Sequence, residues 1–379
     1  MRIIRAGFFL LYVVIFAISG YLGEDLRYLS YVYAVLIIIF LILIRSGVLV
    51  LDRFFASWLI FYSLMFFITT AINFQALKTG YFYNQLFLLL LPPIFAGVLF
   101  SRISPEEPKK IRDLEIFFVR SIFVAAFIRI IPSLHKFDLD NIDILNSTSP
   151  LESGLSHLMG LIFVFCLIRA RKFEMLMSFL LMVLFTKRIA IAATILVIIV
   201  FIIGSLFKEK WQWKTTVIMI MIGNLLYIFL IYDIMYGNIL NKIFRAMTGL
   251  SINQFTLGRF NLYKDLTEMI TPTSIIFGNG TGQVNIFLRQ FKIYEHIGFN
   301  PHSDFLRLFL EYGLLFTILW FGKIYLSQVT QKDYKLLMVP LYLNILMFTD
   351  NVILYHYIMI PFFIIIYFNY KRQQFIKND

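Results

Sequence analysis

Residues 189–207 read IAIAATILVIIVFIIGSLF, nineteen positions without a charged side chain. One helix needs about 20 predominantly apolar residues to cross a bilayer core, and this run has that length. The rest of the chain has the same character, because apolar, aromatic and sulfur residues make up 60% of its 379 positions and charged residues only 15%. This composition excludes a water-soluble globular protein and indicates an all-α, polytopic membrane protein.

Runs of comparable length recur along the chain and predict about twelve transmembrane helices. They lie at 6–22, 28–44, 54–72, 82–100, 114–132, 153–169, 174–186, 189–207, 215–235, 304–325, 336–350 and 352–369. The first run follows two arginines and could pass for a signal peptide, but the spans after it favour a retained helix. We therefore expect a single integral membrane domain over residues 1–379, in which Pro92 and Pro93 kink the fourth helix.

The distribution of lysine and arginine predicts the orientation of the chain. With the N-terminus placed in the cytoplasm, the cytoplasmic segments collect twenty of these residues. The short segments on the other side hold only five, which are Arg27, Lys78, Lys136, Lys187 and Arg188. This bias satisfies the positive-inside rule, so both termini are expected in the cytoplasm. Topology thus accounts for most of the +12 net charge, and nucleic-acid binding is not expected.

Two segments on the outer side are longer than tight turns. Residues 133–152 form a polar loop, and residues 237–303 form a much longer one, of a length that is usually functional. Within the longer loop, 238–247 and 259–270 place apolar residues at helical spacing, so two amphipathic helices are expected against the membrane or the bundle. Six basic and three acidic residues give this loop a net charge of +3, which suits an anionic partner.

Three short motifs near the end of the longer loop carry candidate chemistry. Gly258 and Arg259 open the second amphipathic segment, where unpaired backbone N–H groups and a guanidinium suit a phosphate. The run FGNGTG (277–282) could also cradle a phosphate, but no strand–helix unit surrounds it, so a tight turn is the better interpretation. The third motif, PHSDFLRLFLEYG (301–313), ends the loop and opens a helix.

The third motif places four ionisable side chains at the mouth of a membrane-spanning helix. Asp304, Arg307 and Glu311 share one helical face, which is expected to point into the bundle. Burying a charged group at membrane depth costs roughly 2.5–3.5 kcal/mol, so these residues are expected to have a functional or structural role. A structural ion pair between Arg307 and Glu311 is the leading alternative to a functional role. A loop-to-helix junction does not require an imidazole, so His302 is the strongest functional candidate.

In order and spacing, these motifs resemble the bacterial O-antigen polymerase and O-antigen ligase superfamily of membrane glycosyltransferases. The run LFTKRIAIAATI (184–195) adds to the resemblance, since Lys187 and Arg188 look like the family's arginine that precedes a helix upstream of the large loop. The resemblance covers roughly residues 175–325. Many members have His-Asn where this chain has His302 and Ser303, a departure that bears on the site.

The resemblance implies a GT-C-like membrane glycosyltransferase that acts on glycans carried by undecaprenyl diphosphate at the periplasmic face of the bacterial inner membrane. The leading hypothesis is a polymerase, which moves a growing glycan onto the non-reducing end of a lipid-linked repeat unit. The first alternative is a ligase that moves the glycan onto lipid A core, and a flippase for lipid-linked sugar is the third hypothesis. A chain-length regulator protein is a further candidate partner.

In that chemistry the enzyme holds a diphosphate and orients a sugar hydroxyl. Arg188 and Arg259 are the candidates for stabilising charge on the leaving group, because a guanidinium matches phosphate oxygens. His302 is the candidate for the base or for a group that orients the acceptor hydroxyl. The expected substrate-binding residues are Lys187, Arg129, Asp304, Arg307 and Gly258.

Neither a cofactor nor a metal is expected. Asp138 and Asp140 have a spacing that some glycosyltransferases use for a divalent metal, but a solvated acidic loop is far commoner. The other histidines, which are His135, His157, His296 and His356, show no ligand spacing with one another. The single cysteine, Cys166, lies in an apolar stretch and allows neither a disulfide framework nor a cysteine-based metal site.

Overall fold

In the computed structural model, all regular secondary structure in the described part of the chain is helical. This part comprises residues 51–72, 80–100, 108–131, 154–207, 209–237, 239–249, 259–291, 300–328 and 333–378, with a few positions between 35 and 47. The expected span at 6–22 lies outside the described residues, as do most of the span at 28–44, the loop at 133–152 and Gly258.

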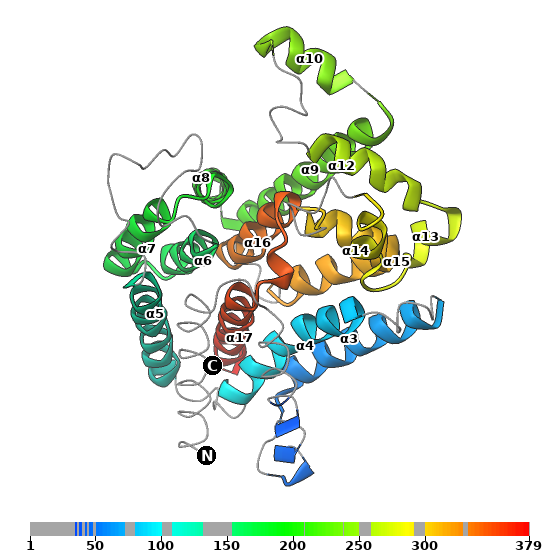
Figure 1. The fold of residues 1–379 in the computed structure, drawn as a ribbon. Coiled ribbons are helices and arrows are strands. Elements are labelled where there is room, and N and C mark those ends of the chain that lie inside the picture. Colours follow the sequence, from blue (N-terminus) through cyan, green and yellow to red (C-terminus); the bar gives the residue numbers. More distant parts are fainter. Residues whose placement is uncertain are drawn as a thin grey trace.

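Each remaining expected span coincides with a helix (Figure 1). These helices are α3 (Arg53–Ile72), α4 (Gly80–Phe100), α5 (Pro108–Ile130), α6 (Leu155–Ile168), α7 (Lys172–Leu184), α8 (Arg188–Leu206), α9 (Glu209–Tyr236), α15 (Asp304–Leu326), α16 (Met338–Thr349) and α17 (His356–Asn378). Among the described helices, four are long and apolar enough to cross a membrane, and they are α3, α8, residues 211–233 of α9, and α15. The total of twelve spans stays a prediction. So does the kink at Pro92 and Pro93, which both lie inside α4.

The centre of the bundle is formed by α6 and α17, whose middle parts are apolar on every side. All residues of α6 from Leu155 to Cys166 are buried, as are residues 358–368 of α17. In Figure 1, α17 (red) lies between α4 and the pair α5 and α6, and it contacts all three helices. By contrast, α8 and α9 expose large apolar side chains such as Ile202 and Leu226. Outward apolar faces of this kind are expected where a helix meets lipid.

The segment between α9 and α15 contains both predicted amphipathic helices. The first is α10 (Ile239–Thr248), and the second is α12 (Arg259–Asp265), which continues as the 3-10 helix η4 (Leu266–Met269). Two shorter helices follow, α13 (Pro272–Phe277) and α14 (Gln283–Leu288). Leu262, Leu266 and Val284 form a small apolar core with Tyr227 of α9 and Leu306 of α15. This core fixes α12 and α14 on the bundle, whereas α10 extends away from it (Figure 1).

The FGNGTG run forms the tight turn that we expected, and the turn packs on a break in α15. Gly313 interrupts α15 with φ 76° and ψ 174°, a conformation that only glycine adopts readily. The break leaves the carbonyls of Leu310 and Glu311 without helical partners, and the backbone N–H groups of Asn279 and Gly280 donate to them at 2.8 and 2.9 Å. The turn therefore satisfies backbone groups that would be costly to leave unpaired in an apolar environment.

Candidate functional site

His302 lies at the junction between the loop and α15, and its backbone conformation is unusual. Its φ is 50°, in the left-handed region that residues other than glycine seldom adopt. The hydroxyl of Tyr263, in α12, donates to the His302 carbonyl at 3.3 Å. Strained conformations of this kind persist only where neighbouring groups hold them, and they concentrate at functional sites.

The next residue, Ser303, caps α15. Its hydroxyl accepts from the backbone N–H of Leu306 at 3.2 Å and hydrogen-bonds to the hydroxyl of Tyr227 at 3.0 Å. Serine and asparagine are both preferred at helix N-caps, because each can accept from the first turn. The departure from the His-Asn of many family members therefore preserves a capping residue and leaves the position of His302 intact.

Charges from several segments act on His302. Burial and the positive charges of Arg259, Arg307 and Lys187 together lower its pKa from 6.5 to about 4, while the negative charge of Asp350 opposes them. These residues come from four separate segments of the chain, and they meet at one end of the bundle. The low pKa keeps the imidazole neutral at physiological pH, which is the state that can accept a proton.

Arg259 is the first residue of α12, and its side chain connects this helix to α16. Its Nη1 donates to the carbonyl of Thr349 at 2.9 Å, one residue before Asp350. The guanidinium also lies close enough to the phenol of Tyr263 to lower the pKa of that group, although burial raises it to about 12. The expected contact of Gly258 with substrate lies outside the described residues.

Lys187 and Arg188 begin α8 after a tight turn, as the sequence predicts. Thr186 before them has φ 39°, and the backbone N–H of Lys187 donates to the buried hydroxyl of Ser156 at 3.3 Å. The side chain of Lys187 is half-buried, and that of Arg188 is exposed. The hydrogen bond places the start of α8 beside the start of α6.

The charged face of α15 is buried, as expected, but its groups do not pair as expected. Asp304 accepts a hydrogen bond from the backbone N–H of Ile353 at 2.6 Å and is fully buried. Arg307 Nη2 donates to the side-chain oxygen of Asn300 at 2.8 Å. Two further donors of Arg307, Nε and Nη1, are buried and have no hydrogen-bond partner among the described residues.

Glu311 makes its hydrogen bonds elsewhere, and the ion pair with Arg307, which was the structural alternative, is not present between these two described residues. Its Oε1 accepts from the backbone N–H of Val284, at the start of α14, at 3.3 Å and from Gln85 of α4 at 3.5 Å. The positive end of a short helix and an amide therefore take the place of the guanidinium. The charge of Arg307 nevertheless acts on both Glu311 and His302.

Sequence reasoning missed an acid–histidine pair at the same end of the bundle. His157 Nε2 and Asp350 Oδ2 are 2.9 Å apart, which joins the start of α6 to the turn after α16. Burial would raise the pKa of Asp350, but the hydrogen bond and charge of His157 hold that pKa well below its usual range. The available signal was weak: each residue lies at the outer end of an expected span, in separate parts of the chain.

Arg129 lies in the last turn of α5, the end at which the sequence places it, and its side chain is half-buried. Its guanidinium carbon is 5.3 Å from the ring centroid of Tyr357, near the start of α17. A cation over an aromatic face is a stabilising arrangement, so the structure gives Arg129 a packing role whatever it binds. Among the described residues no three His, Cys, Asp or Glu side chains cluster with metal-binding geometry.

Most of the candidate site residues lie in a part of the chain that matches a known family model. Residues 156–321 match the family model described as O-antigen ligase. A comparison with curated proteins finds no match. The matched region runs from α6 to α15 and contains Lys187, Arg188, Arg259 and His302, whereas Asp350 follows it. This match covers less than half of the chain, and it supports the resemblance of the motifs to the bacterial O-antigen polymerase and O-antigen ligase superfamily.

Proposed function

We propose that the protein is a polymerase of O-antigen or a related surface polysaccharide. It transfers a growing glycan from undecaprenyl diphosphate onto the non-reducing end of a lipid-linked repeat unit at the periplasmic face of the inner membrane. The observation that carries this proposal is a neutral, half-buried imidazole surrounded by the positive charges of Arg259, Arg307 and Lys187. A base that is not protonated, placed beside several cations, suits a reaction in which a hydroxyl loses a proton and a diphosphate leaves.

The transfer is a substitution at the anomeric carbon of the donor glycan. The acceptor hydroxyl forms a bond to this carbon, the bond between the carbon and the diphosphate oxygen breaks, and undecaprenyl diphosphate leaves with the bonding electrons. In our proposal His302 takes the hydroxyl proton, or orients the hydroxyl while the proton passes to the leaving group. Both roles need a neutral imidazole, and the low pKa of His302 supplies it.

The cations stabilise the charge that grows on the diphosphate. Arg259 and Arg188 present planar guanidinium groups that match phosphate oxygens, and Lys187 adds a compact charge beside them. One preorganised donor of this kind contributes roughly 3–4 kcal/mol to transition-state stabilisation. Asp304 is fully buried and bonded to the backbone near α17, so it supports the start of α15 and leaves substrate contact to Arg307.

The second candidate is a ligase, and the description of the matching family model favours it. A ligase transfers the same lipid-linked glycan to a sugar of lipid A core, so the leaving group and the cationic residues are unchanged. Only the acceptor differs. The distinction therefore lies in the product and calls for an experiment that identifies the product.

A strain that lacks this gene separates the candidates. We expect lipopolysaccharide core that carries a single repeat unit, without the ladder of longer chains. Bare core together with long chains on the lipid carrier would identify a ligase instead. Lipid-linked units retained on the cytoplasmic face would identify a flippase, and an unchanged ladder would contradict all three assignments for this glycan.

Single substitutions then test the site. We predict that His302→Ala and Arg259→Ala each reduce the rate of polymerisation by about 100-fold or more, in a reaction with purified protein and lipid-linked repeat units. Lys264→Gln is the matched control for Arg259, because Lys264 is an exposed cation on the same helix. If both alanine variants accumulate normally and still polymerise at the wild-type rate, the proposed site is wrong.

A further inference from the structure

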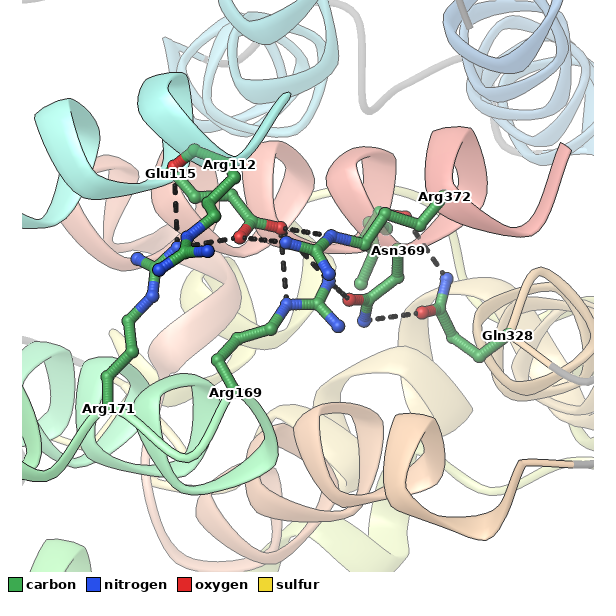
Figure 2. A network of polar contacts seen from close by, with 8 residues as sticks. Arg112, Glu115, Arg169, Arg171, Gln328, Asn369 and Arg372 are labelled. Carbon is green, nitrogen blue, oxygen red and sulfur yellow. Dashed lines mark hydrogen bonds and ion pairs between the residues drawn. The ribbon is translucent and has the colours of Figure 1, made fainter. Parts of the chain in front are cut away.

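The opposite end of the bundle holds a second cluster of buried charge (Figure 2), far along α5 and α6 from the His302 site. Glu115 of α5 is fully buried, and three arginines donate to its carboxylate. Arg169 Nε, at the end of α6, lies 3.2 Å from Oε1, and Arg171 Nη2, before α7, lies 2.8 Å from Oε2. Arg372 of α17 donates through Nε at 3.0 Å and through Nη2 at 2.8 Å.

One carboxylate does not balance three guanidinium groups. The remaining partners of the cluster are neutral: Arg169 Nη2 donates to Asn369 at 2.7 Å, and Asn369 donates in turn to Gln328 at 2.9 Å. Within the part of the chain that the structure describes, no second carboxylate forms an ion pair with these three arginines. Among the described residues, two positive charges thus have no anion in a largely buried setting, an arrangement that carries a desolvation cost.

The cluster retains donor capacity and an opening to the surface. Nη1 of Arg171 is buried and has no hydrogen-bond partner among the described residues. The side chain of Arg372 is 35% exposed, so the cluster can be reached from outside. Arg169 and Arg171 both lie over the ring of Phe165, at 5.3 and 5.8 Å from its centroid, which holds their planes in place. A guanidinium held in this way loses little freedom when it binds a further anion.

The helices at this end of the bundle expose aromatic side chains. Phe117, two residues after Glu115, is 57% exposed, and Phe173, two residues after Arg171, is 69% exposed. Both rings lie on the outward faces of helices that hold or follow the cluster, α5 and α7, where acyl chains are expected. A phosphate attached to acyl chains satisfies both features, whereas a free phosphate uses only the cations.

We propose that the Glu115–Arg169–Arg171–Arg372 cluster binds the phosphate of an anionic phospholipid. The positive-inside distribution of charge places this end of the bundle at the cytoplasmic leaflet, which is rich in anionic lipid. Because the arginines come from the α6–α7 turn and α17 and meet on α5, one bound phosphate links three parts of the bundle. None of these residues lies at the His302 end, so the proposal is independent of the enzymatic function.

The test uses the full-length protein in micelles of neutral detergent. Thermal unfolding is followed while phosphatidylglycerol, phosphatidylcholine or inorganic phosphate is added, and lipid affinity is taken from native mass spectrometry. We expect phosphatidylglycerol to raise the unfolding temperature more than phosphatidylcholine does. Arg372→Gln removes the most exposed arginine of the cluster and should weaken phosphatidylglycerol binding about fivefold, the loss typical of one basic residue at an anionic membrane surface.

Two further variants make the result specific. Arg171→Lys keeps the charge but removes the planar fork, so it should bind phosphatidylglycerol more weakly than the wild type while still folding. Arg53→Gln removes an exposed arginine at the start of α3, outside the cluster, and should leave the affinity unchanged. The proposal would be overturned if both lipids raised the unfolding temperature equally. It would also be overturned if Arg53→Gln and Arg372→Gln lost the same amount of phosphatidylglycerol affinity. If inorganic phosphate raised the unfolding temperature as much as phosphatidylglycerol does, the anion would not need to come from a lipid, and the lipid assignment would be wrong.

Discussion

At the scale of single residues, the protonation state of His302 decides what the imidazole can do. Its pKa of about 4 keeps it neutral at pH values where an ordinary histidine, with a pKa of 6.5, is mostly protonated. We predict nearly full activity at about pH 5.5, where an unperturbed histidine base would retain roughly one tenth. The measurement is the polymerisation rate of the purified protein in liposomes as a function of pH, from below 5.5 to above 6.5. An acid limb near pH 6.5 would contradict the assignment of His302 as a base with a lowered pKa.

Burial and the nearby cations lower the pKa of His302, whereas the negative charge of Asp350 raises it. Asp350→Asn keeps the size of the side chain but removes this charge. The pKa of His302 then falls further, so we predict that the acid limb of the rate profile moves to lower pH. Activity near pH 7 should fall as well, because His157 and Tyr355 lose a charged acceptor. A lower rate with an unshifted acid limb would mean that Asp350 only maintains the fold.

At the scale of elements, the break in α15 is the feature that joins the helix to the FGNGTG turn. A Cβ at Gly313 would lie 2.2 Å from the carbonyl oxygen of Ile276, and φ is 76° there. Gly322 lies in the same helix, and a Cβ there would meet no atom within 4 Å among the described residues. The two glycines therefore form a matched pair for substitution.

We predict that Gly313→Ala destabilises the protein by about 1–3 kcal/mol or more, because the alanine is strained and displaces the turn. Gly322→Ala should be neutral or slightly stabilising, since alanine is the better helix former. Thermal unfolding in detergent compares the two variants. Equal unfolding temperatures would mean that α15 does not need its break. Since the turn holds Glu311 next to α14, loss of activity in Gly313→Ala should accompany loss of stability.

At the scale of the whole molecule, the positions of the helices were predictable and their pairing was not. The run at 189–207 and its counterparts predicted the described helices well, because a bilayer imposes both length and apolar character on any span. That His302, Arg259 and Lys187 form one catalytic site stays a prediction, although the charges of Arg259 and Lys187 both act on the pKa of His302. The prediction came from the order of family motifs, since the three residues lie far apart in the chain.

Contacts between side chains of separate helices had no local signal. His157 and Asp350 are 193 residues apart, and neither position breaks the apolar pattern enough to indicate its partner. The i to i+4 spacing of Arg307 and Glu311 suggested an ion pair, but Asn300 and the start of α14 compete for these groups. Spacing on one helix therefore predicts which groups share a face, whereas neighbouring elements decide which of them bond.

The orientation of the whole chain in the membrane is a prediction that this protein makes easy to test. Its single cysteine, Cys166, is fully buried, so the native chain offers almost no background to a membrane-impermeant thiol reagent. We predict that Lys264→Cys, at an exposed position of α12, is labelled in cells whose outer membrane alone is permeabilised. Lys172→Cys, exposed at the opposite end of the bundle, should react only after the inner membrane is opened. The reverse pattern would place His302 in the cytoplasm and exclude a periplasmic glycan polymerase, because the acceptor sugars would then lie on the other side.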